Sequence, residues 1–378
     1  MMLLKTGIIG VGNAGNMICA LANTTKKMSV IGLNSSERDL DAVKSSTAID
    51  CFYIGSGDGA GKDRSVSKEA LKGSIKDFMG KEQFQKLMKE CDVIFIVSST
   101  GGGTGSGTCP MLADVLRNFY KDKLFVLVGI LPTIGESIGA QRNTIEYISE
   151  VAKLNLPYML FDNGNSGCKS TNATFEKINN DVVEAISIIR GDYNKLSPYG
   201  MIDRGDMEKM ITLPGLIHIN MLKGIYQEQI DTDGSIEDLI LESMKKNTMV
   251  TIDRDKVVRR RAYIVNLSED LQDYFDKDLP KIKETYGEPI EVFDHYAVND
   301  DDEEANYCII MQSGLSLPDN RLKAIKHRID AAEEALKKQK ESSILDSLSE
   351  KVSEFSDTSK NLTKSTSDFN LDDILGKY

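Results

Sequence analysis

The sequence predicts a doubly wound α/β domain followed by a smaller α+β domain, and three observations support this prediction. Short apolar runs rich in Val, Ile and Phe alternate with helical stretches through the first half of the chain. This alternation is typical of parallel strands that are buried on both faces and joined by helices. A long helical segment then separates this half from a second set of strands and helices. The length of 378 residues, with 40% hydrophobic residues, is sufficient for two domains.

The apolar runs of the first half give its elements in order. The expected strands are Leu3–Ile9, Met28–Leu33, Val93–Val97, Phe125–Leu131 and Tyr158–Phe161. The expected helices are Asn16–Thr24, Ser67–Lys89 and Pro110–Lys121. A central helix is predicted from about Phe175 to Arg190, because apolar residues recur there at helical spacing and Gly191 is a typical stop.

The second half reads as a smaller α+β domain after a loop over Asn194–Asp206. Its expected strands are Leu216–Ile219, Ala262–Asn266, Ile290–Ala297 and Tyr307–Gln312. Its expected helices are Ser235–Asn247, Asp270–Tyr286 and the strongly charged Asn320–Lys340. These elements divide the chain into a first domain, a central helix, a second domain, a C-terminal helix and a tail, with bounds 1–172, 173–193, 194–319, 320–341 and 342–378.

The tail is rich in Ser, Thr, Lys and Asp up to Ser367, which indicates disorder. Its last ten residues regain apolar character. They are either a frayed terminus or a short partner-binding peptide on a flexible tether.

Composition excludes several classes of function. The net charge of -12 makes direct, non-specific DNA binding a poor fit, so contact with nucleic acid would run through a partner. No apolar run reaches the roughly 18–20 residues that span a bilayer, and no signal peptide is recognised. The 6 cysteines are scattered, as in reduced cytoplasmic proteins. His218 lies in a predicted strand, where we expect it to be packed rather than catalytic.

Three glycine-rich segments, at 10–16, 55–62 and 101–107, follow predicted strands. Glycine lets the backbone approach a phosphate closely, and the N–H groups at a helix N-terminus then face the anion. The third segment has five glycines in seven residues, which is costly in chain entropy and adds nothing to a core. We therefore interpret it as a phosphate-binding loop rather than a flexible connection.

The first glycine segment by itself also matches another class of site. Gly10-x-Gly12-x-x-Gly15 fits the dinucleotide fingerprint, and Ser36 with Arg38 after the next strand could suit an NADP ribose phosphate. An NADP-dependent enzyme is therefore the rival of a different class. It leaves the third glycine segment unexplained. A P-loop is excluded, because Gly61-Lys62-Asp63 lacks the hydroxyl residue after the lysine.

The third segment resembles the signature of the tubulin/FtsZ superfamily, and the resemblance extends over roughly residues 3 to 340. Ser106 makes it most similar to tubulins and to the plasmid or phage TubZ branch. The resemblance implies a doubly wound, Rossmann-like GTPase domain, a long central helix, a smaller α+β domain, and a C-terminal helix and tail. It also implies GTP or GDP as ligand, with Mg²⁺ on the phosphates. No residue is assigned as a metal ligand.

The same resemblance implies a set of nucleotide-binding residues. In the order of the family's loops they are Gly12, Asn13, Ala14 and Asn16; Asn34; Gly59, Ala60 and Gly61; Gly101, Gly102, Gly103, Thr104, Gly105, Ser106 and Gly107; Glu136; Asn163; and Asn180. Within this set, Asn16, Asn163 and Asn180 would contact the base and Glu136 the ribose.

The resemblance places catalysis at Asp203 and Asp206, which form an Asp-x-x-Asp motif after the central helix. By spacing alone the two acids would be assigned to a solvated surface turn. An alternative alignment through Pro214–Asn220 would put Asn220 and Lys223 where acids are required, so Pro214–Ile219 is better interpreted as a strand. In the family such acids act on the nucleotide of the next subunit, and the active site is complete only in a filament.

The leading functional hypothesis is a GTPase that polymerises head-to-tail and moves plasmid or phage DNA in the cytoplasm of a bacterial host. A separate DNA-binding adaptor protein would hold the C-terminal tail. The alternative within the superfamily is a cell-division filament.

Overall fold

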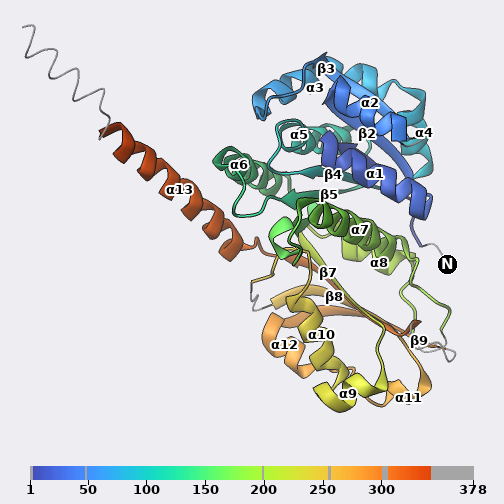
Figure 1. Cartoon of the computed structure of the whole chain (residues 1–378). Coiled ribbons are helices and arrows are strands. Elements are labelled where there is room, and N and C mark those ends of the chain that lie inside the picture. Colours follow the sequence, from blue (N-terminus) through green and yellow to red (C-terminus); the bar gives the residue numbers. More distant parts are fainter. Residues whose placement is uncertain (1–2, 47–48, 198–199, 254–256, 300–304, 342–378) are drawn as a thin grey trace, which may run out of the picture. The chain divides into compact units, whose positions relative to one another are not determined.

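The computed structural model describes residues 3–46, 49–197, 200–253, 257–299 and 305–341 (Figure 1). The predicted tail, 342–378, lies outside the described residues. Ten strands form one continuous sheet in the order β3-β2-β1-β4-β5-β6-β7-β10-β8-β9. The chain divides into two compact units, Met1–Arg328 and Ile329–Tyr378. The finer division into five segments stays a prediction.

The first six strands of the sheet are parallel. They are β1 (Thr6–Val11), β2 (Ser29–Ser36), β3 (Asp50–Gly57), β4 (Val93–Ser99), β5 (Leu124–Leu131) and β6 (Pro157–Asp162). All residues of β1 and β6 are buried, as expected for strands covered on both faces. The strand order reverses between β1 and β4, which is where ligands bind in open α/β sheets.

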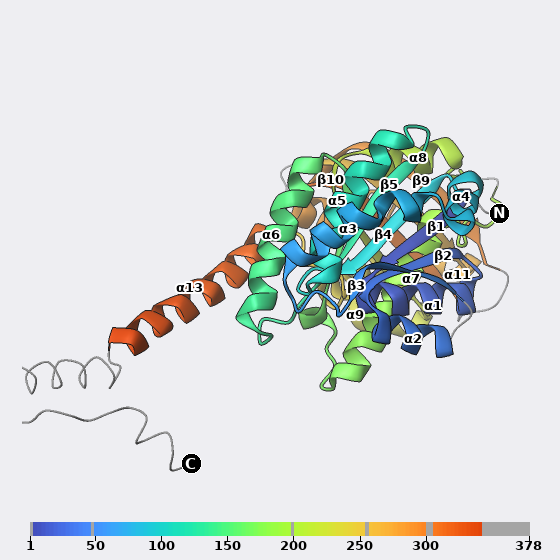
Figure 2. The ribbon, with the colours of Figure 1, turned by 90° about the horizontal axis from the view of Figure 1, so that it is seen from above.

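Helices cover both faces of this parallel half (Figure 2). One face carries α1 (Gly12–Lys26), α2 (Glu37–Ser46) and α7 (Thr171–Arg190), and the other carries α3 (Arg64–Met79), α5 (Thr104–Phe119) and α6 (Ile138–Leu154). Two short helices, α4 (Glu82–Glu90) and α8 (Arg204–Thr212), complete this part. The predicted doubly wound class is confirmed.

The central helix α7 begins four residues earlier than predicted and ends where predicted. The Ser170 side chain accepts a hydrogen bond from the N–H of Ala173 and caps the N-terminus. Gly191 terminates the helix in the left-handed conformation, with φ 94°, which suits a residue without Cβ. The buried residues Val182, Ile186 and Ile189 are part of the core.

The second half continues the same sheet. β7 (Gly215–Lys223) pairs with β6 through only two residue pairs, whereas β10 (Tyr307–Leu315) pairs antiparallel with β7 and with β8 (Val257–Leu267) along most of its length. β9 (Glu288–Val298) is parallel to β8. The helices of this half are α9 (Gln227–Asp233), α10 (Ile236–Lys245), α11 (Glu269–Gln272), α12 (Pro280–Tyr286) and α13 (Asp319–Glu341).

Two predicted helices are wrong in extent. The stretch Ser67–Lys89 is two helices, because the chain turns at Gly80 between α3 and α4. The stretch Asp270–Tyr286 is also two, since Leu279 adopts a left-handed conformation, with φ 41°, before Pro280 starts α12. No described helix is long and apolar enough to cross a membrane.

Several elements were not predicted from the sequence: β3, α2, α6, α8 and α9. Because β3 contains Gly55 and Gly57, the second glycine segment lies partly within a strand rather than after one. The apolar residues of this edge strand form one short run, Cys51–Ile54, which was not assigned as a strand. The signal for α6 was present, since its buried residues Ala140, Thr144, Tyr147 and Val151 recur at helical spacing.

Candidate functional site

The carboxyl ends of the parallel strands bring the predicted loops to one edge of the sheet. Adjacent strands end nearly level, with Val11 paired to Ser98, Ser99 to Ile130, and Leu131 to Asp162. The loops that follow β1, β2, β4, β5 and β6 therefore all emerge at this edge.

Direct contacts join three of these loops to one another and to the loop after β3. A Cβ added to Gly12 would lie 3.3 Å from the backbone N of Gly105, so the first and third glycine segments touch. The Ser35 Oγ and Thr104 Oγ1 atoms are 2.7 Å apart, and the N–H of Gly59 donates to the Ser35 carbonyl at 3.1 Å. The loops after β1, β2, β3 and β4 thus form one contiguous surface.

The glycine run 101–107 is closely packed, contrary to the expectation that it adds nothing to a core. A Cβ at Gly103 would lie 2.7 Å from the Cα of Lys62, and a Cβ at Gly105 would lie 2.8 Å from the Cβ of Ser98. At Gly107 it would lie 2.1 Å from the Ser67 Oγ. Close approach to neighbouring backbone and side chains, rather than a flexible loop, therefore requires glycine here.

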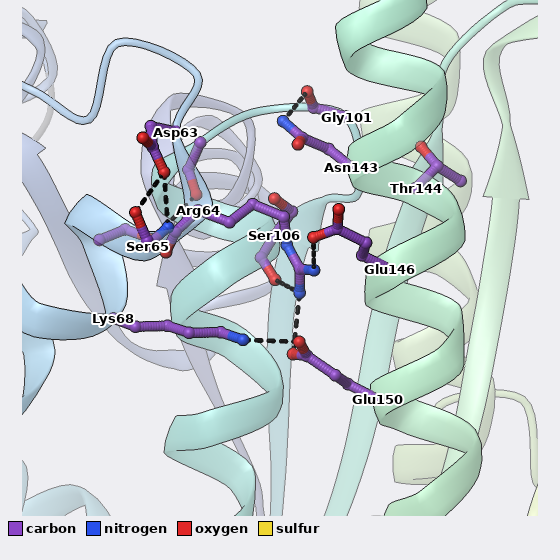
Figure 3. Close-up of polar contacts among 12 residues, drawn as sticks. Asp63, Arg64, Ser65, Lys68, Gly101, Ser106, Asn143, Thr144, Glu146 and Glu150 are labelled. Carbon is purple, nitrogen blue, oxygen red and sulfur yellow. Dashed lines mark hydrogen bonds and ion pairs between the residues drawn. The ribbon is translucent and has the colours of Figure 1, made fainter. Parts of the chain in front are cut away.

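Side chains from α3 and α6 hold the carbonyls of the run from behind (Figure 3). The Asn143 Nδ2 atom donates to the carbonyls of Gly101 and Gly102, each at 3.2 Å. The Ser67 hydroxyl donates to the Gly103 carbonyl at 3.0 Å. These bonds fix the backbone of the run at Gly101–Gly103.

Two helix N-termini meet at this surface. α1 starts at Gly12 and α5 starts at Thr104, and neither has a hydrogen bond from a capping side chain. The first helical hydrogen bond of α5 joins the Gly107 N–H to the Gly103 carbonyl, so the preceding N–H groups have no partner within the helix. Such donors, together with the helix dipole, favour a bound anion such as phosphate.

The asparagines predicted to bind the base differ in how many of their side-chain polar atoms already form hydrogen bonds. Asn16 is fully buried; its Oδ1 accepts from the Leu33 N–H at 3.1 Å, while its Nδ2 has no partner. Asn163 follows β6, and its buried Oδ1 has no partner. Asn180 is exposed on α7 and donates to the Glu176 carbonyl of its own helix at 2.8 Å. Asn16 and Asn163 therefore carry spare hydrogen-bonding groups.

The remaining predicted binding residues lie on the same loops. Asn34 is buried, and its side chain bonds to Asp39 and to the N–H of Ser36. The Glu136 carboxylate is exposed and accepts from the Thr133 N–H at 2.9 Å. Gly59 and Gly61 both have positive φ, and Asn13 and Ala14 occupy the first turn of α1 with little burial.

Arg321 was not found from the sequence, yet it links the loops after β5 and β6. Its guanidinium forms an ion pair with Asp162, whose side chain is 3% exposed, and donates to the Pro132 carbonyl at 2.7 Å. The Asp162 carboxylate also accepts from the Gly164 N–H, next to Asn163. The first turn of α13 thereby fixes the loops that contain Glu136 and Asn163.

Asp203 and Asp206 lie together at the start of α8. The Asp203 Oδ1 accepts from the Asp206 N–H at 2.9 Å, and the Asp206 Oδ2 accepts from the Asp203 N–H at 3.3 Å, which makes a capping box. Asp203 is exposed and Asp206 is partly exposed. The two acids, which spacing alone would assign to a solvated turn, therefore form a helix cap.

The two acids lie at the opposite edge of the sheet from the glycine run. Arg204, next to Asp203, pairs with Asp92 at 3.3 Å, and Asp92 immediately precedes the first residue of β4. The glycine run follows the last residue of that strand. Seven residues of β4 at about 3.3 Å each separate the two edges by roughly 20 Å. Within one chain, the acids and the phosphate-binding loop do not meet.

The alternative alignment of the catalytic segment places its residues inside β7. Asn220 is 2% exposed and bonds to Ser243, while Lys223 ion-pairs with Glu184. His218 is packed as expected, and burial lowers its pKa to about 4. Pro214–Asn220 is thus largely part of a strand, as predicted, and the catalytic assignment of Asp203 and Asp206 stays a prediction.

A cluster of three or more His, Cys, Asp or Glu side chains able to hold a metal ion is absent from the described residues. Mg²⁺ usually keeps several waters and is held by one or two protein oxygens together with substrate phosphates. The paired hydroxyls of Ser35 and Thr104, beside the uncapped start of α5, fit that arrangement.

Residues 5–166 match the family model described as "Tubulin/FtsZ family, GTPase domain". This match confirms, for the first part of the chain, the resemblance noted in the sequence. Among relatives, a tubulin-like protein CetZ of Thermococcus kodakarensis is 32% identical over 191 residues, covering 49% of this chain and 50% of that protein. The tubulin-like protein TubZ of Clostridium botulinum C phage is 25% identical over 211 residues, covering 54% of this chain and 55% of that protein.

The chain spans about half the length of the curated relatives it matches. A solved structure supports the fold over a greater length. The GTPγS-form protofilament of Bacillus thuringiensis serovar israelensis TubZ superposes with a TM-score of 0.72 at 16% identity, covering 90% of this chain and 95% of that chain. The fold beyond residue 166 is therefore also tubulin-like.

Proposed function

We propose that this protein binds GTP and hydrolyses it at the contact between two copies of itself in a head-to-tail filament. One observation carries the proposal: the glycine run and the two acids lie at opposite edges of the sheet. A second copy can bring its Asp203 and Asp206 to the glycine run of the first. Repeating that contact between unlike surfaces produces an open filament when the rotation does not close a ring.

The phosphates would be bound by the backbone N–H groups at the starts of α1 and α5. Phosphoryl transfer requires mainly positioning and electrostatic stabilisation, with a water placed in line with the γ-phosphorus. The incoming Asp203 and Asp206 carboxylates would accept hydrogen bonds from that water and orient it. The Ser35 and Thr104 hydroxyls would help to hold Mg²⁺, which would supply positive charge to offset that of the phosphates.

Selectivity for guanine would rest on Asn16 and Asn163. Each has a buried polar atom without a partner, one a donor and one an acceptor. A buried polar group without a partner costs roughly 1–3 kcal/mol, which a matching base edge would recover. Glu136, exposed on the loop after β5, would bind the ribose. The exposed Asn180 would reach the base only after releasing its bond to Glu176.

In the cell, we propose that the filament moves plasmid or phage DNA through an adaptor protein. The similarity to TubZ of a phage supports this role. A cell-division filament is the alternative within the superfamily. The match of residues 5–166 to a GTPase family favours GTP over the NADP suggested by the first glycine segment alone.

The test measures light scattering and phosphate release against protein concentration, with GTP and Mg²⁺. The proposal expects both signals to appear above a shared threshold concentration. GTP turnover that stays proportional to protein concentration at all concentrations would refute the shared site. Binding of NADP in place of GTP would refute the nucleotide assignment.

A further inference from the structure

Pro110 lies inside α5 and leaves one carbonyl of the glycine run without its helical donor. A helical N–H normally donates to the carbonyl four residues earlier, and proline has no N–H. The affected carbonyl belongs to Ser106. Its donor is instead the Nη2 atom of Arg64, at 3.0 Å, from the first residue of α3.

Arg64 is 5% exposed, and two carboxylates of one helix bind its guanidinium in Figure 3. Its Nη1 pairs with Glu146 at 2.7 Å and its Nη2 pairs with Glu150 at 2.8 Å, both on α6. Lys68 also pairs with Glu150, at 2.6 Å, without a hydrogen bond to α5. The guanidinium is thus fixed in charge and direction, with one donor aimed at the Ser106 carbonyl.

Arg64 also directly follows the loop that contains Gly59, Ala60 and Gly61. Asp63 at the end of that loop caps α3 by accepting from the Ser65 N–H at 2.8 Å. The backbone of Lys62 in the same loop is packed against Gly103. A displacement of this loop would therefore be transmitted to Arg64 and to the start of α5.

We propose that Arg64 is a positioning residue of the nucleotide site. By binding the Ser106 carbonyl it holds the first turn of α5, so that the N–H groups of the glycine run point toward the phosphates. It also makes that turn respond to the loop at Gly59–Gly61. This inference rests on the proposed GTP-binding function, and it predicts a specific dependence on Pro110.

The experiment is a double-mutant cycle of Arg64→Met and Pro110→Ala. Methionine keeps the length and apolar stem of arginine but has no donor, whereas alanine at 110 restores an N–H for the Ser106 carbonyl. The readout is the Kd for GTP with Mg²⁺ below the assembly threshold, with melting temperature as a fold control. Arg64→Lys is a second probe if Arg64→Met does not fold, since one ammonium group cannot replace all three guanidinium contacts.

Arg64→Met alone should raise the Kd about tenfold, the usual effect of losing a hydrogen bond from a charged donor. In the Pro110→Ala background, Arg64→Met should raise the Kd less than about threefold. The two replacements are coupled, because the restored N–H of residue 110 can donate to the Ser106 carbonyl in place of Arg64. The matched control Lys68→Met, which also removes a partner of Glu150, should leave the Kd unchanged. Equal losses in both backgrounds, or no loss in either, would overturn the proposal. Absence of GTP binding by the wild-type protein would instead refute the proposed function itself.

Discussion

Replacing Asp203 by asparagine separates its two roles, helix capping and catalysis. The Asp203 Oδ1 accepts from the Asp206 N–H at 2.9 Å, and an asparagine side chain keeps an acceptor there. Asparagine and aspartate are about equally good N-caps, whereas alanine costs about 1 kcal/mol. Asp203→Asn should therefore melt close to the wild type, and Asp203→Ala should be less stable by about 1 kcal/mol.

Turnover should respond differently from stability. Loss of the carboxylate that orients the attacking water should lower GTP hydrolysis about 100-fold or more in both variants. Assembly should persist, because the nucleotide-binding edge is unchanged. The assay is phosphate release at saturating GTP, with light scattering to verify filaments. The matched control is Glu208→Gln, which neutralises another acid of α8 that pairs with Arg204. Wild-type turnover by assembled Asp203→Asn would refute the catalytic assignment.

Three further perturbations follow from the structure. Gly103→Ala places a Cβ 2.7 Å from the Lys62 Cα and should destabilise the fold by about 1–3 kcal/mol in urea unfolding and weaken GTP binding. Gly73→Ala, where the Cβ meets open space, should instead stabilise by about 0.5–1 kcal/mol; equal effects would contradict the packing argument. Burial lowers the His218 pKa from 6.5 to about 4, so stability is complete above pH 6.5 and falls by about 2 kcal/mol by pH 5. The free energy of unfolding should therefore differ less between pH 7 and pH 5 in His218→Leu than in the wild type, by about 2 kcal/mol. The same difference in both proteins would contradict the assignment to His218. Arg321→Met leaves the buried Asp162 carboxylate without its ion pair and should cost about 3 kcal/mol in the same unfolding assay, with weaker GTP binding; an unchanged urea midpoint would contradict this role.

The parallel half of the fold was predictable because its signals are local. β4 and β5 contain continuous apolar runs, Val93–Val97 and Leu124–Val128, and such runs identify strands buried on both faces. β3 was missed because its apolar run, Cys51–Ile54, is short and the glycines that follow it were interpreted as a loop. The break at Leu279 was missed although Pro280 is a local signal for it, because proline favours the first turn of a helix over its interior.

The residues of the candidate site also fall into two groups: those that local sequence patterns predicted and those that depend on distant partners. Glycines at 101–107 were found from sequence because so many glycines in one short run are rarely compatible with an ordinary loop or helix. Arg64 and Arg321 were missed because their partners, Ser106 and Asp162, are 42 and 159 residues away. The one local signal was Pro110, which implies a carbonyl without a helical donor but not the side chain that supplies one.

The sequence by itself predicted the class of the first domain and the glycine run proposed to bind phosphate, and the family resemblance supplied the two candidate acids. Glycine spacing, strand periodicity and the Asp-x-x-Asp motif are properties of adjacent residues and need no tertiary information. The tertiary structure decided that the glycines serve close packing and that Asp203 caps a helix. It also decided that the acids lie roughly 20 Å from the glycine run, at the other edge of the sheet. Pairing between distant strands and helices sets these relations, and they are what make a second copy necessary for the proposed chemistry.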